Sequence, residues 1–189
     1  MAIVSENSTC MICDETLDRS FLSTWGVWLG PKHPLFRYCD APFHIDCMAN
    51  WTHRIEFSRS YFEMWRNVYR GSMGNLLIEQ EDWILVTGPT GPHITPDMKA
   101  DSAKILLDVS GRSEDTPEPF YAMVITANWP LRLRTAWLNW DAFVSGAYRN
   151  HLVDGAMSEA SRVMTSVARI APDLMALRGL LANHIHKMN

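Results

Sequence analysis

All four cysteines of this 189-residue chain lie in its first quarter, and none occurs after Cys47. Cys10 and Cys13 form a Cys-x2-Cys pair, Cys39 follows, and Cys47 stands three residues after His44. Core packing alone gives no reason for cysteines to gather in one segment, whereas a metal ion needs several ligands at one place. The cluster therefore constrains the fold of the N-terminal segment more than any other feature of the sequence.

The spacing of these residues predicts one structural zinc ion. Zinc takes four ligands in a tetrahedron, and thiolate and imidazole are donors that it favours in proteins. We expect the set Cys10, Cys13, His44 and Cys47, because both pairs have a spacing at which two side chains reach the same ion. Cys39 is the alternative fourth ligand, in place of His44. Otherwise Cys39 is a buried free thiol, packed like a small apolar residue.

Three other interpretations of the cysteines are open. Two disulfides would require an oxidising compartment, and residues 1–8 lack the basic region and apolar core of a signal peptide. A redox pair at Cys10 and Cys13 would follow a strand, yet the residues before Cys10 are mostly polar. The third alternative is that the cysteines are reduced and buried without a metal. We expect a cytoplasmic protein that binds zinc.

The sequence around the cysteines predicts a hairpin and a long helix. Residues 24–29 are aromatic and β-branched, as in a strand, residues 30–34 are rich in turn formers, and residues 35–39 form the expected return strand. A helix is expected from about residue 45 to 69. Its apolar stripe is so broad that we expect it to pack against both the zinc site and the rest of the chain. The stripe consists of Trp51, Ile55, Phe62, Trp65 and Tyr69.

A metal knuckle, a hairpin and a helix that begins with the second ligand pair resemble treble-clef and RING-like zinc modules, over about residues 8–70. The stretch from Cys39 through His44 and Cys47 to Trp51 is similar to the middle of a RING finger. A RING finger binds two zinc ions, however, and here Asn50 stands where a further ligand is needed and no later cysteine pair exists. The resemblance therefore implies a treble-clef-like module with a single zinc.

The remainder of the chain predicts an antiparallel sheet of about four strands, followed by helices. Strands are expected within residues 76–88, at 103–109, at 120–127 and at 131–137, with loops at 88–96 and 110–119. Two C-terminal helical stripes are separated by Pro172. The predicted fold class is α+β, with a zinc module over residues 1–70 and an α+β domain over residues 71–189 packed against it.

Composition and motifs exclude several functions. A formal charge of −4 and a pI of about 5.9 are unlike those of a general nucleic-acid binder. The sequence contains no run of 18 apolar residues, so we expect no membrane span. Residues 88–96 lack the Gly-Lys-Ser/Thr ending of a phosphate loop, and no Gly-x-Ser-x-Gly, His-Glu-x-x-His or zinc deaminase motif occurs. We expect a protein partner, no nucleic acid and no membrane.

The expected function is that of a non-enzymatic, zinc-stabilised binding or adaptor protein. One such role is an inhibitor or accessory factor in a bacterial toxin or defence system. Trp129 and Trp140 stand at or near predicted turns, which makes them candidate interface anchors. The resemblance also implies two alternatives, a RING-like factor that recruits a ubiquitin-like conjugating enzyme and a treble-clef nuclease. For a nuclease His53 is the extra histidine, but it follows His44 by two and a half helical turns and would point away from it.

Overall fold

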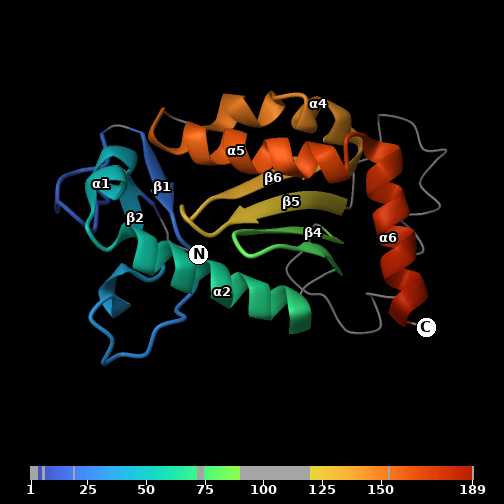
Figure 1. The fold of residues 1–189 in the computed structure, drawn as a ribbon. Helices are drawn as coiled ribbons and strands as arrows, with labels where there is room; N and C mark the ends of the chain where they lie inside the picture. The colour runs from blue at the N-terminus through green and yellow to red at the C-terminus, as the bar shows by residue number, and fades with distance from the viewer. Residues whose placement is uncertain are drawn as a thin grey trace.

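The computed structural model describes residues 4–5, 7–18, 20–71, 75–89, 120–152 and 154–188. Within them the chain is α+β, which confirms the predicted fold class (Figure 1). The strand predicted at 103–109 and the loop at 110–119 lie outside the described residues, as does most of the loop at 88–96.

The helices and strands follow one another in an order that puts a small β pair first, a sheet in the middle and helices last. In chain order they are β1 (Phe21–Ser23), the 3₁₀ helix η1 (Phe36–Tyr38), β2 (Pro42–His44), α1 (Ile45–Asn50), α2 (Arg54–Gly71), β3 (Asn75–Glu79), β4 (Trp83–Pro89), β5 (Phe120–Thr126), β6 (Arg132–Ala136), η3 (Trp137–Asn139), α4 (Trp140–Val144), η4 (Ala147–His151), α5 (Asp154–Ile170) and α6 (Leu174–Met188).

The main sheet has four antiparallel strands in the order β3-β4-β5-β6. Its strands confirm the predictions at 76–88, 120–127 and 131–137. Alternate residues point to opposite faces. Leu85, Val124 and Leu133 belong to the same buried cluster as residues of α5, whereas Ile84 and Met123 are buried with residues of α2. The sheet therefore lies between α5 on one face and α2 on the other (Figure 1).

The prediction of a hairpin with strands at 24–29 and 35–39 was wrong, although an antiparallel β pair does flank this segment. The paired residues are those of β1 and β2, which lie outside the expected strands at 24–29 and 35–39. Trp25 stacks on Trp65 of α2 with ring centroids 5.1 Å apart, and Trp28 lies 4.8 Å from Tyr61 of the same helix. Gly26 has a φ of 85°, which suits glycine and does not fit a strand. These aromatic residues thus pack on α2 instead of extending the β pair.

The single helix predicted from residue 45 to 69 is two helices. Trp51 has an extended backbone, with φ −75° and ψ 124°, and ends α1. It is therefore not part of the apolar stripe on α2, although its ring packs 4.6 Å from that of Tyr38 and 5.3 Å from that of Phe57. The break places this tryptophan over the hairpin connection, which a continuous helix would not do. Ile55, also assigned to the stripe, is exposed.

Trp129 and Trp140 are both buried, so the prediction that they are exposed interface anchors was wrong. Trp140 begins α4 (Trp140–Val144), a short helix that was not predicted, and its indole N–H donates to the carbonyl oxygen of Ala171 over 3.0 Å. The guanidinium group of Arg54 lies over the ring of Trp129, with its Cζ atom 4.9 Å from the ring centroid. The break near Pro172, between α5 and α6, agrees with the prediction.

The N-terminal segment and the sheet share one hydrophobic core. Cys10, Ile45 and Met48 are in the same buried cluster as Val124 of β5 and Ala160 of α5. The order of the elements thus brings the segment with the cysteines against the middle of the molecule. Among the described helices, none is both long enough and apolar enough to cross a membrane.

Candidate metal centre

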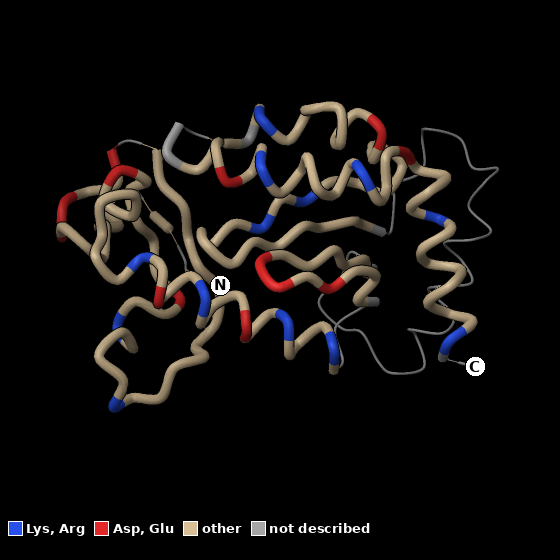
Figure 2. The backbone as a smooth tube through the Cα atoms, in the orientation of Figure 1, with Lys and Arg blue, Asp and Glu red and all other residues tan. Residues whose placement is uncertain are grey.

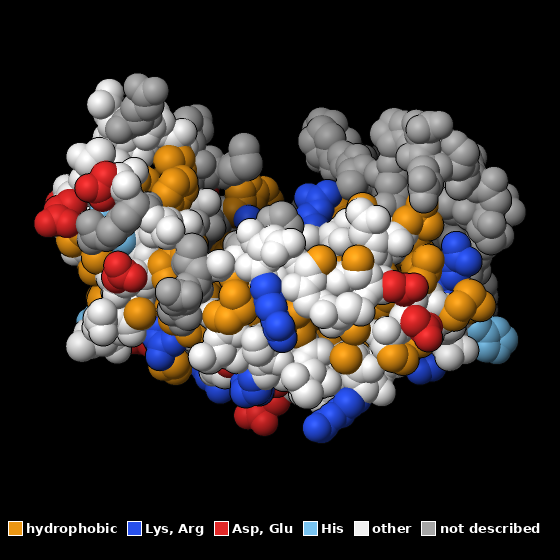
Figure 3. Space-filling model, turned by 90° about the horizontal axis from the view of Figure 1, so that it is seen from above, with side chains coloured by type: hydrophobic (Ala, Val, Ile, Leu, Met, Phe, Trp, Pro, Cys, Tyr) orange, Lys and Arg blue, Asp and Glu red, His pale blue; other side chains and the backbone are white. Residues whose placement is uncertain are grey.

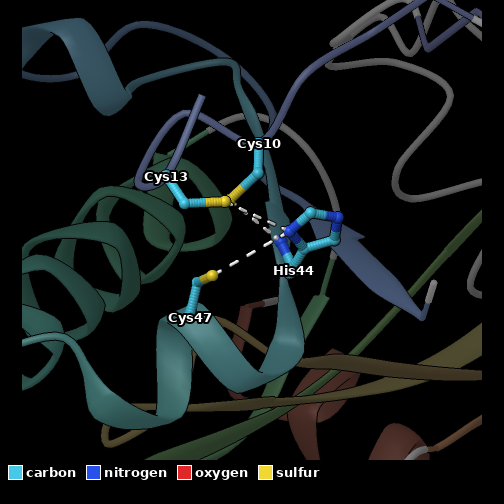
Figure 4. A group of neighbouring side chains, drawn as sticks. All are labelled: Cys10, Cys13, His44 and Cys47. Atoms are coloured by element: carbon cyan, nitrogen blue, oxygen red, sulfur yellow. Dashed lines mark hydrogen bonds between the residues drawn. The ribbon is translucent and has the colours of Figure 1, made fainter. Parts of the chain in front are cut away.

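The structure brings Cys10, Cys13, His44 and Cys47 together (Figure 4). Their four potential ligand atoms all lie within 4.8 Å of one another. Nδ1 of His44 is 3.5 Å from Sγ of Cys13 and 3.9 Å from Sγ of Cys47. In a tetrahedral zinc site, bonds of about 2.3 Å to sulfur and about 2.0 Å to nitrogen separate neighbouring ligand atoms by roughly 3.5–3.8 Å. The two distances from Nδ1 are close to those of a zinc site, and the four atoms could hold one metal ion.

A tight turn holds the first two cysteines on the same side of the chain. The backbone N–H of Asp14 donates to the carbonyl oxygen of Cys10 over 2.8 Å, and the N–H of Cys10 donates to the carbonyl oxygen of Glu15 over 2.8 Å. Asp14 has a φ of 60°, a left-handed conformation that aspartate adopts more readily than most residues. This turn points the side chain of Cys13 back toward that of Cys10.

The second pair comes from the junction of β2 and α1. His44 is the last residue of β2 and precedes the first residue of α1, and Cys47 lies in the first turn of that helix. Side chains three residues apart at a helix start lie on the same side. The antiparallel pairing of Phe21 with His44 fixes the end of β2, and with it the position of the histidine. Figure 4 shows both side chains turned toward the two sulfurs of the knuckle.

A backbone contact orients the imidazole of His44. Its Nε2 lies 3.0 Å from the carbonyl oxygen of Thr16, and 3.7 Å from a carboxylate oxygen of Asp18. A carbonyl oxygen can only accept a hydrogen bond, so Nε2 carries the hydrogen and Nδ1 presents its lone pair to the sulfurs. Metal-bound histidines generally have such a partner, which fixes the tautomer and the ring orientation. Sequence could not have shown this contact, because the acceptor is a main-chain atom.

The environment of the sulfurs also suits a cation. Burial on its own would raise the pKa of the Cys10 thiol, but hydrogen bonds from the backbone N–H groups of Cys13, His44 and Ile12 outweigh it, and the pKa is lowered. Burial, followed by hydrogen bonds and charges of Cys13 and Cys10, raises the pKa of the Cys47 thiol to about 11. Thiolates this close repel one another, and a metal ion between them removes that repulsion.

The remaining candidates lie apart from this group. Cys39, the alternative ligand, is buried after η1 and does not join the four residues that the structure brings together. The imidazole of His53, the additional histidine of the nuclease alternative, is about half exposed and lies 3.6 Å from the carboxylate of Glu56. Within the described part of the chain, the four residues are the one group of histidine, cysteine and acidic side chains with this metal-binding spacing.

Comparison with protein-family models, with curated proteins and with solved structures finds no match for this chain. The geometry of the site and the chemistry of its donors must therefore carry any functional argument.

Proposed function

We propose that this protein is a non-enzymatic, zinc-stabilised binding protein, with a treble-clef-like module at its N-terminus. The observation that carries the proposal is the complete set of three sulfurs and one imidazole nitrogen within 4.8 Å of one another. Three thiolates and one imidazole are a common ligand set of structural zinc sites. The proposed ligands are Cys10, Cys13, His44 and Cys47, with one zinc ion per chain.

A structural role follows from the number of donors. A catalytic zinc has three protein ligands and keeps its fourth position open for water or substrate. Here four protein donors fill a tetrahedral shell, and Cys10 and His44 are fully buried. The zinc would connect the knuckle at Cys13 to the first turn of α1 at Cys47. It would thereby fasten the N-terminal segment to the hydrophobic core.

The order of the ligands supports the treble-clef-like assignment. One pair lies on a knuckle, a β pair follows, and the second pair lies at the end of β2 and in the first turn of α1. A RING-like recruitment factor would have only half of the usual docking scaffold, because no second metal group is found among the described residues. A nuclease would need a further histidine directed at the site, and the contact of His53 with Glu56 directs it elsewhere.

With the metal in a structural role, the surface of the protein carries the function. We infer that it recognises a protein partner, because the acidic net charge does not suit nucleic acid in general. The direct test has two parts. The first part concerns the metal: elemental analysis of the purified, reduced protein should give one zinc per chain, and the zinc-loaded protein should cleave neither DNA nor RNA.

The second part is reconstitution of a complex. A partner isolated from the native host should bind the purified zinc-loaded protein at a defined stoichiometry, measured by isothermal titration calorimetry. Binding should be lost in Cys13→Ser, which removes one zinc ligand. Two zinc ions per chain, or nucleic-acid cleavage that disappears in His53→Ala, would contradict the proposal.

A further inference from the structure

Strand β6 is one edge of the four-stranded sheet, since β5 is its sole neighbour among the described strands. The hydrogen bond from the N–H of Thr126 to the carbonyl oxygen of Leu131 shows that the polar backbone groups of Leu131 face β5. Backbone groups of alternate residues point to opposite sides of a strand. The N–H and C=O groups of Arg132 and Arg134 therefore point outward, and no described residue hydrogen-bonds them.

A hollow of about 250 Å³ lies beside this edge. Leu22 and Ser23 of β1 line it, and Leu133, Tyr148 and Leu152 are among its other lining residues. The hollow thus combines an open row of backbone groups with apolar side chains. By contrast, hydrophobic side chains on the face shown in Figure 3 lie in separate patches among charged ones.

Two arginines mark the edge. Arg132 and Arg134 are exposed, and strand alternation puts both on the sheet face opposite that of Leu133. Figure 2 shows basic positions, in blue, along β6. The guanidinium group of Arg132 lies 5.0 Å from the ring centroid of Trp65, and that of Arg134 lies 4.1 Å from the ring centroid of Tyr121. These ring contacts hold the charged groups in place and leave N–H donors for another acceptor.

No carboxylate of the described residues pairs with these two arginines. Other arginines of the protein do have acidic partners, for example Arg66 with Glu79 and Arg162 with Asp82. Arg132 and Arg134 thus place two neighbouring positive charges on one face of β6, on a chain whose formal net charge is −4. A ligand that adds to this edge would complement it with negative charge at every second position.

We propose that the edge of β6 binds an extended peptide in which acidic residues alternate with apolar ones. This inference rests on the proposed binding function and names the class of partner. The peptide would add a fifth strand, with its backbone paired to Arg132 and Arg134, as in other β-augmentation complexes. Its acidic side chains would lie opposite the two guanidinium groups, and its apolar side chains would enter the hollow on the side of Leu133.

A second copy of the chain is a poorer occupant of the same edge. Pairing of β6 with β6 across a two-fold axis would bring Arg132 and Arg134 of one protomer next to those of the other. Like charges opposite each other destabilise a strand pair. Charge complementarity therefore favours an acidic peptide over self-association.

The experiment measures binding of fluorescein-labelled peptides to the full-length, zinc-loaded protein by fluorescence anisotropy. The test peptide alternates glutamate with valine, and a permuted peptide has the same composition in two blocks. We expect the alternating peptide to bind at least about tenfold more tightly than the permuted one, and to weaken as salt is added. N-methylation of the amides that face β6 should abolish its binding, because those amides form the new ladder.

The double variant Arg132→Glu/Arg134→Glu should lose at least about tenfold in affinity for the glutamate peptide and should gain affinity for a lysine–valine peptide. Arg59→Glu, a charge reversal at an exposed position of α2, is the matched control and should bind as the wild type does. Arg132→Gln/Arg134→Gln removes the charge without reversing it and tests the charge if the reversal disturbs folding. Zinc content and circular dichroism check that each variant is folded.

Equal binding of the alternating and permuted peptides, or unchanged binding after N-methylation, would overturn the inference. A dimer that dissociates in the double variant, seen by analytical ultracentrifugation, would assign the edge to a second copy instead. If the reconstituted partner binds the double variant as tightly as it binds the wild type, the edge is not its site, but the proposed binding function stands. If no partner can be reconstituted at all, the proposed function itself fails.

Discussion

At the scale of single residues, the cysteines differ in what the loss of a sulfur should do. Cys13→Ser and Cys47→Ser are each expected to release the zinc and to lower solubility, because a structural zinc contributes its binding free energy directly to folding. Cys39→Ser should keep one zinc per chain, since Cys39 lies outside the four-residue group. Elemental analysis of the purified variants measures this. Loss of metal in Cys39→Ser together with retention in His44→Ala would instead indicate a four-thiolate site.

The two buried tryptophans allow a second test at this scale. Trp140→Phe removes the indole N–H that bonds the carbonyl oxygen of Ala171. Leaving a buried acceptor without its donor should lower the free energy of unfolding by about 1–3 kcal/mol, measured by urea denaturation. Trp129→Phe is the matched control, because it makes the same reduction in ring size and leaves an aromatic ring under Arg54. An equal loss in both variants would show that ring volume, not the hydrogen bond, explains the effect.

At the scale of elements, Glu79 of β3 joins the sheet to α2. Its carboxylate accepts a hydrogen bond from Nε of Arg66 at 2.5 Å and one from Nε of Arg70 at 3.1 Å. The hydrogen bond from Arg70 is the largest cause of a pKa lowered from the ordinary value of 4.5; partial burial opposes it, and Arg66 adds to the lowering. The chain thus uses one carboxylate to hold two arginines of the helix that covers the sheet.

This lowered pKa predicts a pH dependence. A carboxyl group whose pKa is lower in the folded state stabilises the protein above its unfolded pKa, and the stabilisation is lost as the pH falls through the folded pKa. Glu79→Gln should therefore lower the free energy of unfolding by up to about 1 kcal/mol near neutral pH. The difference from the wild type should shrink below about pH 4. Urea denaturation at several pH values measures it, and a difference that grows on acidification would contradict the assignment.

The elements also show what the sequence could and could not predict. Strands β4 and β5 were recognisable because each buries residues on both faces and therefore has a nearly continuous apolar run. The hairpin strands were misplaced because Trp25 and Trp28 have strand-like composition but pack on α2. The break at Trp51 was missed, because tertiary contacts with Tyr38 and Phe57 decide it rather than a glycine or proline.

The candidate site was predictable for a different reason. Metal ligands are recognised by residue type and spacing, and these survive an error in the local backbone. His44 and Cys47 lie at the end of β2 and in the first turn of α1, although the strand was predicted at 35–39 and the helix was predicted to continue to residue 69. Spacing could predict neither the main-chain acceptor at Thr16 nor the separation of Cys39 from the four-residue group.

At the scale of the whole molecule, the candidate metal centre and the sheet are parts of one core. Cys10 and Met48 pack in the same buried cluster as Val124 and Ala160, which lie far along the chain. Removal of zinc should therefore destabilise the sheet as well as the N-terminal segment. Heating with and without a chelator, followed by differential scanning calorimetry, should show one transition in each case, with the chelated protein melting at a lower temperature.

Hydrogen exchange gives the more local measurement of the same prediction. Strands β4 and β5 are buried on both faces, so their amides should exchange slowly in the zinc-loaded protein. If the core is cooperative, chelation should speed exchange in β5, although none of its residues contributes to the metal centre. Two separate calorimetric transitions, with exchange accelerated in residues 7–50 alone, would show instead that the zinc module unfolds as an independent unit.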